Sequence, residues 1–191
     1  HGLVFLTGPT GSGKTTTLYS LMAEMDAVHD NIATIEDPVE YRLPLVRQSQ
    51  TDVSIGFGFQ EGLRALLRQD PDTILVGEIR DKETAEMAIK ASMTGHLVFS
   101  TLHTNSAIGA VPRLIELGID PFLVEDSLIG VLAQRLVRSN CSGCSDAVQP
   151  TPEDLEFLEG VPGKLRKGQG CLRCRSTGYS GRTALTELFL P

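Results

Sequence analysis

The sequence predicts an α/β fold in which helices cover both faces of a parallel sheet, followed by a smaller cysteine-containing module. Short β-rich apolar runs alternate with helical patterns over the first part of the chain, and a glycine-rich loop joins the first run to the first helix. From Asn140 onward Gly, Pro and Cys become frequent and the strand pattern fades. We therefore expect a main domain over residues 1–139, the small module over 140–182, and a segment over 183–191 that returns to the main domain. With 191 residues, of which 41% are hydrophobic, the chain can bury a core.

The predicted strands and helices alternate along the main domain. Apolar runs predict buried strands at residues 3–7, 32–35, 73–76 and 97–101, and apolar residues at helical spacing predict helices at 14–27, 60–67 and 84–93. Such alternation is typical of a parallel sheet, whose ligands bind at the carboxyl ends of the strands. Polar residues follow each predicted strand, so we expect them to meet at one edge of the sheet.

The loop after the first strand matches the phosphate-binding pattern G-x-x-x-x-G-K-[ST] in full. Its glycines allow backbone N–H groups to surround a triphosphate, and the helix that follows points its positive end at the anion. Lys14 can reach the β- and γ-phosphates, and the Thr15 hydroxyl can bind Mg²⁺. We expect nucleotide contacts from Gly8, Pro9, Thr10, Gly11, Ser12, Gly13, Lys14, Thr15 and Thr16. The loop predicts binding of a nucleoside triphosphate such as ATP.

Carboxylates follow two other predicted strands. Glu78 comes after residues 73–76, as the acid of a Walker B strand does, and is the candidate general base that activates water. Gly77 stands where a metal-facing Asp usually precedes that Glu, so we expect Glu36 and Asp37 to assist Thr15 at Mg²⁺. Pro38 excludes helical geometry from the residue before it, which keeps both acids at a strand end. The alternative is a turn that is polar because solvent surrounds it.

Histidines and arginines supply further candidates. His96 and His103 flank the strand at 97–101, and we expect them to sense the γ-phosphate, although a lone His is more often packed or on the surface. Arg64 and Arg68 lie four residues apart on one helical face, where they could neutralise a phosphate across a subunit boundary as arginine fingers do. Arg80, close after Glu78, is a third candidate. The alternative for the helical pair is a solvated face on which Glu61 is the partner.

The cysteines form two pairs that can close a tetrahedral zinc site. Cys141-x-x-Cys144 and Cys171-x-x-Cys174 are separated by 26 residues and together use all four cysteines of the chain. Disulfides would require an oxidising compartment, which nothing else in the sequence indicates. Arg138, Arg173 and Arg175 lie near the pairs in sequence and can offset the thiolate charge. The run Thr151-Pro152-Glu153-Asp154 predicts a short helix between the pairs, and the site is expected to be structural.

Composition excludes several classes of partner. The net charge is −7, Trp is absent and aromatic residues make up 5%, which argues against nucleic-acid binding and against a translocase. No apolar run reaches the length of a membrane span and no leader pattern opens the chain, so we expect a cytosolic protein without membrane insertion. The chain begins at His1, only seven residues before the loop, which suggests a missing upstream region.

Taken together, these motifs resemble the secretion ATPases of the type II secretion and type IV pilus superfamily. The matching segments are residues 8–17 (Walker A), 34–40 (aspartate box), 75–81 (a Walker B that lacks its Asp) and 94–105 (histidine box). The tetracysteine module is similar to that of the assembly ATPases and is lacking in retraction ATPases. Residues 109–114 and 132–138 look closer to the type II secretion members.

The resemblance implies a RecA-like P-loop NTPase core and a homo-hexamer with ATP bound between subunits. It also implies a peripheral position at the cytoplasmic face of the inner membrane, with the upstream region docked to a membrane-anchored partner of the secretion platform. The function expected from it is an ATP-hydrolysing motor that drives pseudopilus assembly in type II secretion. The alternatives are a motor for pilus extension and, from another class, a zinc-dependent binding module in which the nucleotide acts as a switch.

Overall fold

The computed structural model describes residues 1–158 and 165–191, which form two compact units. The first unit comprises His1–Arg135 with Thr186–Pro191, and the second comprises Leu136–Leu185. The domain boundaries given above, at residues 139/140 and 182/183, stay a prediction.

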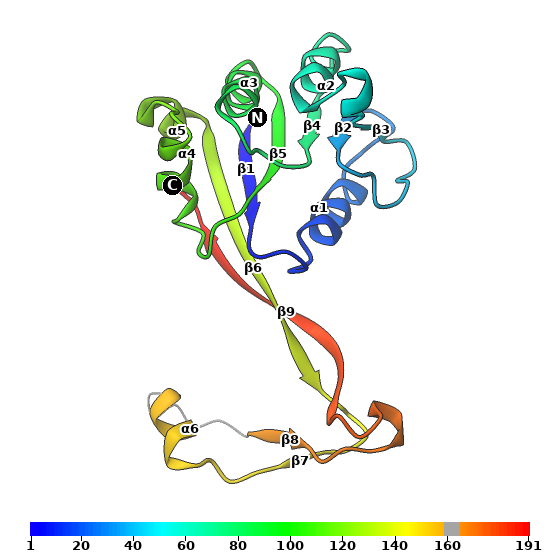
Figure 1. The fold of residues 1–191 in the computed structure, drawn as a ribbon, viewed down its shortest axis with the longest axis vertical. Helices are drawn as coiled ribbons and strands as arrows, with labels where there is room; N and C mark the ends of the chain where they lie inside the picture. The colour runs from blue at the N-terminus through cyan, green and yellow to red at the C-terminus, as the bar shows by residue number, and fades with distance from the viewer. Residues whose placement is uncertain (159–164) are drawn as a thin grey trace. The chain divides into compact units, whose positions relative to one another are not determined.

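A seven-stranded sheet in the order β3-β2-β4-β5-β1-β6-β9 forms the centre of the fold (Figure 1). Its strands are β1 (Gly2–Thr7), β2 (Ile32–Glu36), β3 (Arg47–Gln50), β4 (Thr73–Val76), β5 (Leu97–Leu102), β6 (Leu128–Asn140) and β9 (Tyr179–Phe189). The pairs β1–β5, β1–β6, β2–β3, β2–β4 and β4–β5 are all parallel, so the predicted parallel sheet is confirmed. The apolar runs predicted β1, β2, β4 and β5, whereas β3, β6 and β9 were not predicted.

Helices cover both faces of this sheet, as predicted. On one face, Leu18, Tyr19 and Met22 of α1 (Lys14–Ala23) pack with Leu6 and Phe99 from the strands. The other face packs against α2 (Phe59–Leu66), α3 (Lys82–Met93), α4 (Ala110–Glu116) and α5 (Pro121–Ser127). Alternate residues of each central strand supply the two cores: Leu3 and Phe5 face one side while Leu6 faces the other. A short 3₁₀ turn, η1 (Val53–Ile55), precedes α2.

The second unit contains the cysteines, the last residues of β6 and the first residues of β9. Its short elements are β7 (Ser145–Ala147), which pairs antiparallel with β8 (Arg166–Gly168), the 3₁₀ turn η2 (Leu172–Cys174) and α6 (Pro152–Phe157). The short helix predicted here is confirmed: Thr151 Oγ1 accepts from the Asp154 N–H and Asp154 accepts from the Thr151 N–H. Residues 159–164 of the predicted module lie outside the described residues.

None of the helices in the described residues is long and apolar enough to cross a membrane.

Candidate nucleotide and metal sites

The glycine-rich loop between β1 and α1 has the backbone that an anion site requires. Gly8, Gly11 and Gly13 all have positive φ, a conformation that glycine adopts without steric cost. A Cβ at Gly8 would lie 2.2 Å from the Gln134 carbonyl oxygen, so only glycine fits there. α1 begins at Lys14 and no side chain caps its amino-terminal end. The N–H groups of its first turn therefore face the loop without a side-chain acceptor.

Lys14 and Ser12 fit a bound phosphate. Lys14 Nζ lies over the loop and donates to the carbonyl oxygens of Gly8 (2.8 Å) and Pro9 (3.1 Å). Burial lowers the pKa of Lys14, and the carboxylate of Glu78 opposes that shift. Ser12 Oγ is buried and has no hydrogen-bond partner among the described residues. A cation aimed at the loop and a buried hydroxyl without a partner are both complementary to phosphate oxygens.

Glu78 follows β4 and lies at the same edge of the sheet as the loop. The backbone beside it is fixed from two neighbouring strands, because Gly77 N donates to Ile35 O (2.8 Å) and Ile79 N donates to Thr101 O (3.1 Å). Its side chain is 14% exposed, forms an ion pair with Arg80, and lies near His103, whose Nε2 is 3.6 Å from Glu78 Oε2. Lys14 is close enough for the charge of Glu78 to act on it. The structure thus brings Lys14, Glu78, Arg80 and His103 together.

Thr7, the last residue of β1, holds the segment that carries His103. Thr7 Oγ1 donates to Leu102 O (3.0 Å) and accepts from Thr104 N (2.8 Å). Because the phosphate loop begins at the next residue, one buried side chain joins the loop to the end of β5.

Glu36 is buried behind this edge in a hydrogen-bond network. Its side chain is 4% exposed and accepts from Thr34 Oγ1 (2.5 Å), Gln48 Nε2 (3.3 Å) and the Tyr19 hydroxyl. Burial, followed by the hydrogen bond to Glu36, raises the pKa of Tyr19. Asp37 is exposed and Thr15 is half-buried. A magnesium role for Thr15, Glu36 and Asp37 stays a prediction. To bind the ion, the Glu36 carboxylate would have to give up one of its three hydrogen bonds.

Three candidates are not brought to this edge within the chain. His96 lies at the opposite end of β5, where its Nδ1 contacts Ala91 O (2.8 Å) and its carbonyl accepts from Gly2 N at the start of β1. Arg64 and Arg68 are exposed on and after α2. Arg64 pairs with Glu83 of α3 at 3.3 Å and not with Glu61, since Glu61 caps α2 by accepting from Gly58 N.

The four cysteine side chains form one cluster. All their Sγ atoms lie within 4.8 Å of one another, with pairs at 3.9 Å (Cys141–Cys171), 3.8 Å (Cys144–Cys174) and 3.7 Å (Cys171–Cys174). Four thiolates around zinc at about 2.3 Å lie about 3.8 Å apart, so the donor set fits Zn²⁺. Hydrogen bonds, chiefly from the Cys171 N–H, lower the pKa of Cys174 to about 6. The backbone N–H groups of Cys171 and Gly178, which donate to Cys174 Sγ, therefore favour the thiolate form of Cys174, the form that binds metal.

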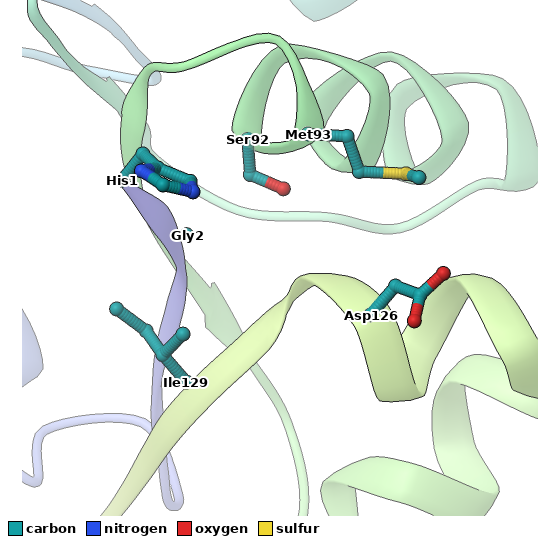
Figure 2. A pocket seen from close by; sticks show the side chains of 6 residues that line it. All are labelled: His1, Gly2, Ser92, Met93, Asp126 and Ile129. Atoms are coloured by element: carbon teal, nitrogen blue, oxygen red, sulfur yellow. The ribbon is translucent and has the colours of Figure 1, made fainter.

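A pocket of about 190 Å³ lies at the other end of β1 from the phosphate loop. Figure 2 shows Ser92 and Met93 of α3, Asp126 of α5 and Ile129 of β6 around it, with His1 at the start of the chain. It contains none of the predicted nucleotide-binding residues.

Comparisons with known proteins agree with this geometry. A family model described as "Type II/IV secretion system protein" matches residues 1–191. The chain is 53% identical over its whole length to the type II secretion system protein E of Pectobacterium carotovorum, of which it covers 38%. It is also 50% identical to the type IV pilus assembly ATPase PilB of Thermus thermophilus, covering 100% of this chain and 22% of that protein. The chain thus spans well under half the length of these relatives.

Solved structures show the same fold. The pilus retraction motor PilT with bound ADP aligns with a TM-score of 0.71 and 34% identity, covering 100% of this chain and 47% of that one. The ATPase DotB of Legionella pneumophila aligns with a TM-score of 0.66 and 27% identity, covering 99% and 45%. From the match over all 191 residues and the shared fold, this chain belongs to the type II/IV secretion system protein family.

Proposed function

We propose that this chain is the ATP-hydrolysing part of a motor that energises protein export by a type II secretion system. The observation that carries the proposal is the meeting of Lys14, Glu78 and His103 at the carboxyl ends of three neighbouring strands. The relatives named type II secretion system protein E support the choice of system. Pilus extension is the second candidate, because the relative PilB is 50% identical.

In the proposed reaction, the loop N–H groups and Lys14 bind the β- and γ-phosphates of ATP. Glu78 accepts a proton from the water that attacks the γ-phosphorus, and ADP is the leaving group. His103, 3.6 Å from Glu78, is proposed to sense the γ-phosphate, whereas His96 lies at the opposite end of β5. Thr15, assisted by Glu36 or Asp37, would hold Mg²⁺, which supplies positive charge to the phosphates when it is bound.

The proposed assembly is a homo-hexamer with ATP between subunits, in the cytoplasm and peripheral to the inner membrane. We propose that Arg64 or Arg68 reaches the nucleotide of a neighbouring subunit, since both are exposed and neither contacts the phosphate loop of its own chain. A region outside this chain would dock to the membrane-anchored secretion platform. The tetracysteine unit is proposed to be a structural zinc subdomain because its four thiolates leave no open ligand position.

Two substitutions separate binding from hydrolysis. We expect Lys14→Ala to abolish tight nucleotide binding, because the loop then lacks its cation. Glu78→Gln should bind ATP normally and hydrolyse it about 10²-fold more slowly, the usual loss for a general base. Titration with a fluorescent ATP analogue and a phosphate-release assay measure the two effects. Equal loss of binding in both variants would show that Glu78 is a metal ligand and not the base.

A further inference from the structure

The buried side chain of Gln134 joins the phosphate loop to the helix that follows it. Gln134 lies on β6 and is 4% exposed. Its Nε2 donates to Ser12 O at 2.7 Å, and its Oε1 accepts from Thr17 Oγ1 at 2.9 Å. One amide group therefore binds the loop on one side and the first turn of α1 on the other.

These two bonds require an amide at position 134. The Ser12 carbonyl can only accept, so the amide nitrogen must face it, which leaves Oε1 for the Thr17 hydroxyl. An ionised glutamate could not donate to Ser12 O, and a methionine could form neither bond. The bond to Ser12 O is buried and the bond to Thr17 Oγ1 is partly buried, so the loss of Gln134 leaves polar groups there without their partner.

The bond to Ser12 also fixes the next peptide group. In a trans peptide the Ser12 C=O and the Gly13 N–H point in opposite directions. Since the carbonyl is held toward Gln134, the Gly13 N–H faces away from β6. In that direction the N–H is free to donate a hydrogen bond to a phosphate. Gly8 packs on the same residue from the other end of the loop, where its missing Cβ would lie 2.2 Å from Gln134 O.

We propose that Gln134 is a positioning residue that presets the phosphate loop for the β-phosphate of a nucleotide. The inference rests on the proposed function, because it assumes that the loop binds nucleotide. The β-phosphate is common to nucleoside di- and triphosphates, so Gln134 should support the binding of ADP and ATP equally. Among the described residues its side chain bonds to Ser12 and Thr17 and not to Glu78, so the chemical step should be little affected once the site is filled.

The test uses Gln134→Met, Thr17→Val and the double variant in the full-length protein. Fluorescent analogues of ADP and ATP give the dissociation constants, and phosphate release at saturating ATP gives kcat. We expect Gln134→Met to raise both dissociation constants about tenfold and to leave kcat within about threefold. Thr17→Val should weaken binding less, and the double variant should bind no worse than Gln134→Met, because both changes break one shared contact. Gln69→Met, an exposed glutamine before β4, is the matched control.

Unchanged dissociation constants in Gln134→Met and Thr17→Val, or penalties that simply add in the double variant, would overturn the inference. If Gln134→Met does not fold, Thr17→Val decides: weaker binding at an unchanged nucleotide-free melting temperature supports the inference, and unchanged binding refutes it. Lys14→Ala separates this inference from the proposed function. If Lys14→Ala abolishes binding while Gln134→Met does not weaken it, only the role of Gln134 fails. If Lys14→Ala leaves binding intact, the nucleotide site itself is wrong.

Discussion

At the scale of single residues, the backbone of β2 lies close to Gly77, the position at which a Walker B strand usually has an Asp. A Cβ at this position would lie 3.3 Å from both Glu36 Cα and Ile35 O, and 3.5 Å from the Phe59 ring. A side chain at position 77 would therefore press on the backbone of β2. The same close approach allows Gly77 N to bond Ile35 O and sets the position of Glu78.

We expect Gly77→Asp to destabilise the fold and to leave the hydrolysis rate no higher than before. The added side chain must displace the β2 backbone, which costs about 1–3 kcal/mol for an overpacked site. Urea unfolding measures the free energy of unfolding of Gly77→Asp and of the control Gly130→Ala. At Gly130 the nearest atom to the new Cβ is a Leu190 side-chain carbon at 3.5 Å, which is an ordinary contact. A Gly77→Asp variant as stable as wild type and faster in phosphate release would show that the position can hold a metal ligand.

Residue patterns predicted the phosphate loop and Glu78 because each motif lies within one short segment. They could not place His96, since a histidine just before a strand and one just after it look equivalent in sequence. The six residues of β5 separate them by about 20 Å at the rise of a strand. Gln134 was missed because its partners, Ser12 and Thr17, lie more than a hundred positions away, and the only local signal is a polar residue within an apolar run.

At the scale of elements, the sequence predicted the central strands better than the outer ones. β2 and β4 are continuous buried runs, which is typical of the middle of a parallel sheet. β3 reads Arg-Gln-Ser-Gln at the edge and has no apolar pattern to detect. α1 ends at Ala23, earlier than the predicted residue 27, and no basic residue lies in its last turn to stabilise a longer helix.

The second unit depends on its cysteines more than on a hydrophobic core. Among the described residues of this unit, the buried side chains are those of Cys141 and Cys174. We expect one Zn²⁺ per chain, and we expect its removal to unfold residues 140–182 while the nucleotide-binding unit keeps its structure. Elemental analysis, followed by limited proteolysis after chelation, measures both effects. A protein that contains no zinc and whose thiols are oxidised in pairs would contradict this prediction.

At the scale of the whole molecule, we propose that phosphoryl transfer uses positive charge from a neighbouring subunit. Of the basic residues that contact or influence Glu78, Lys14 is aimed at the loop and Arg80 is paired with Glu78 itself. An arginine from a neighbouring subunit typically raises the rate of such a site about 10³-fold or more. We therefore expect the isolated chain to bind ATP with Mg²⁺ but to hydrolyse it slowly.

The most direct test of the proposed active site and of the arginine acting between subunits is steady-state phosphate release as a function of protein concentration. The rate is measured for the 191-residue chain, for the full-length hexamer and for the hexamer with Glu78→Gln. We predict slow turnover by the dilute chain, a rate about 10³-fold higher in the hexamer, and loss of that rate in the Glu78→Gln hexamer. Fast turnover by the isolated chain that does not depend on concentration would contradict the arginine acting between subunits. A Glu78→Gln hexamer as active as wild type would contradict the proposed active site.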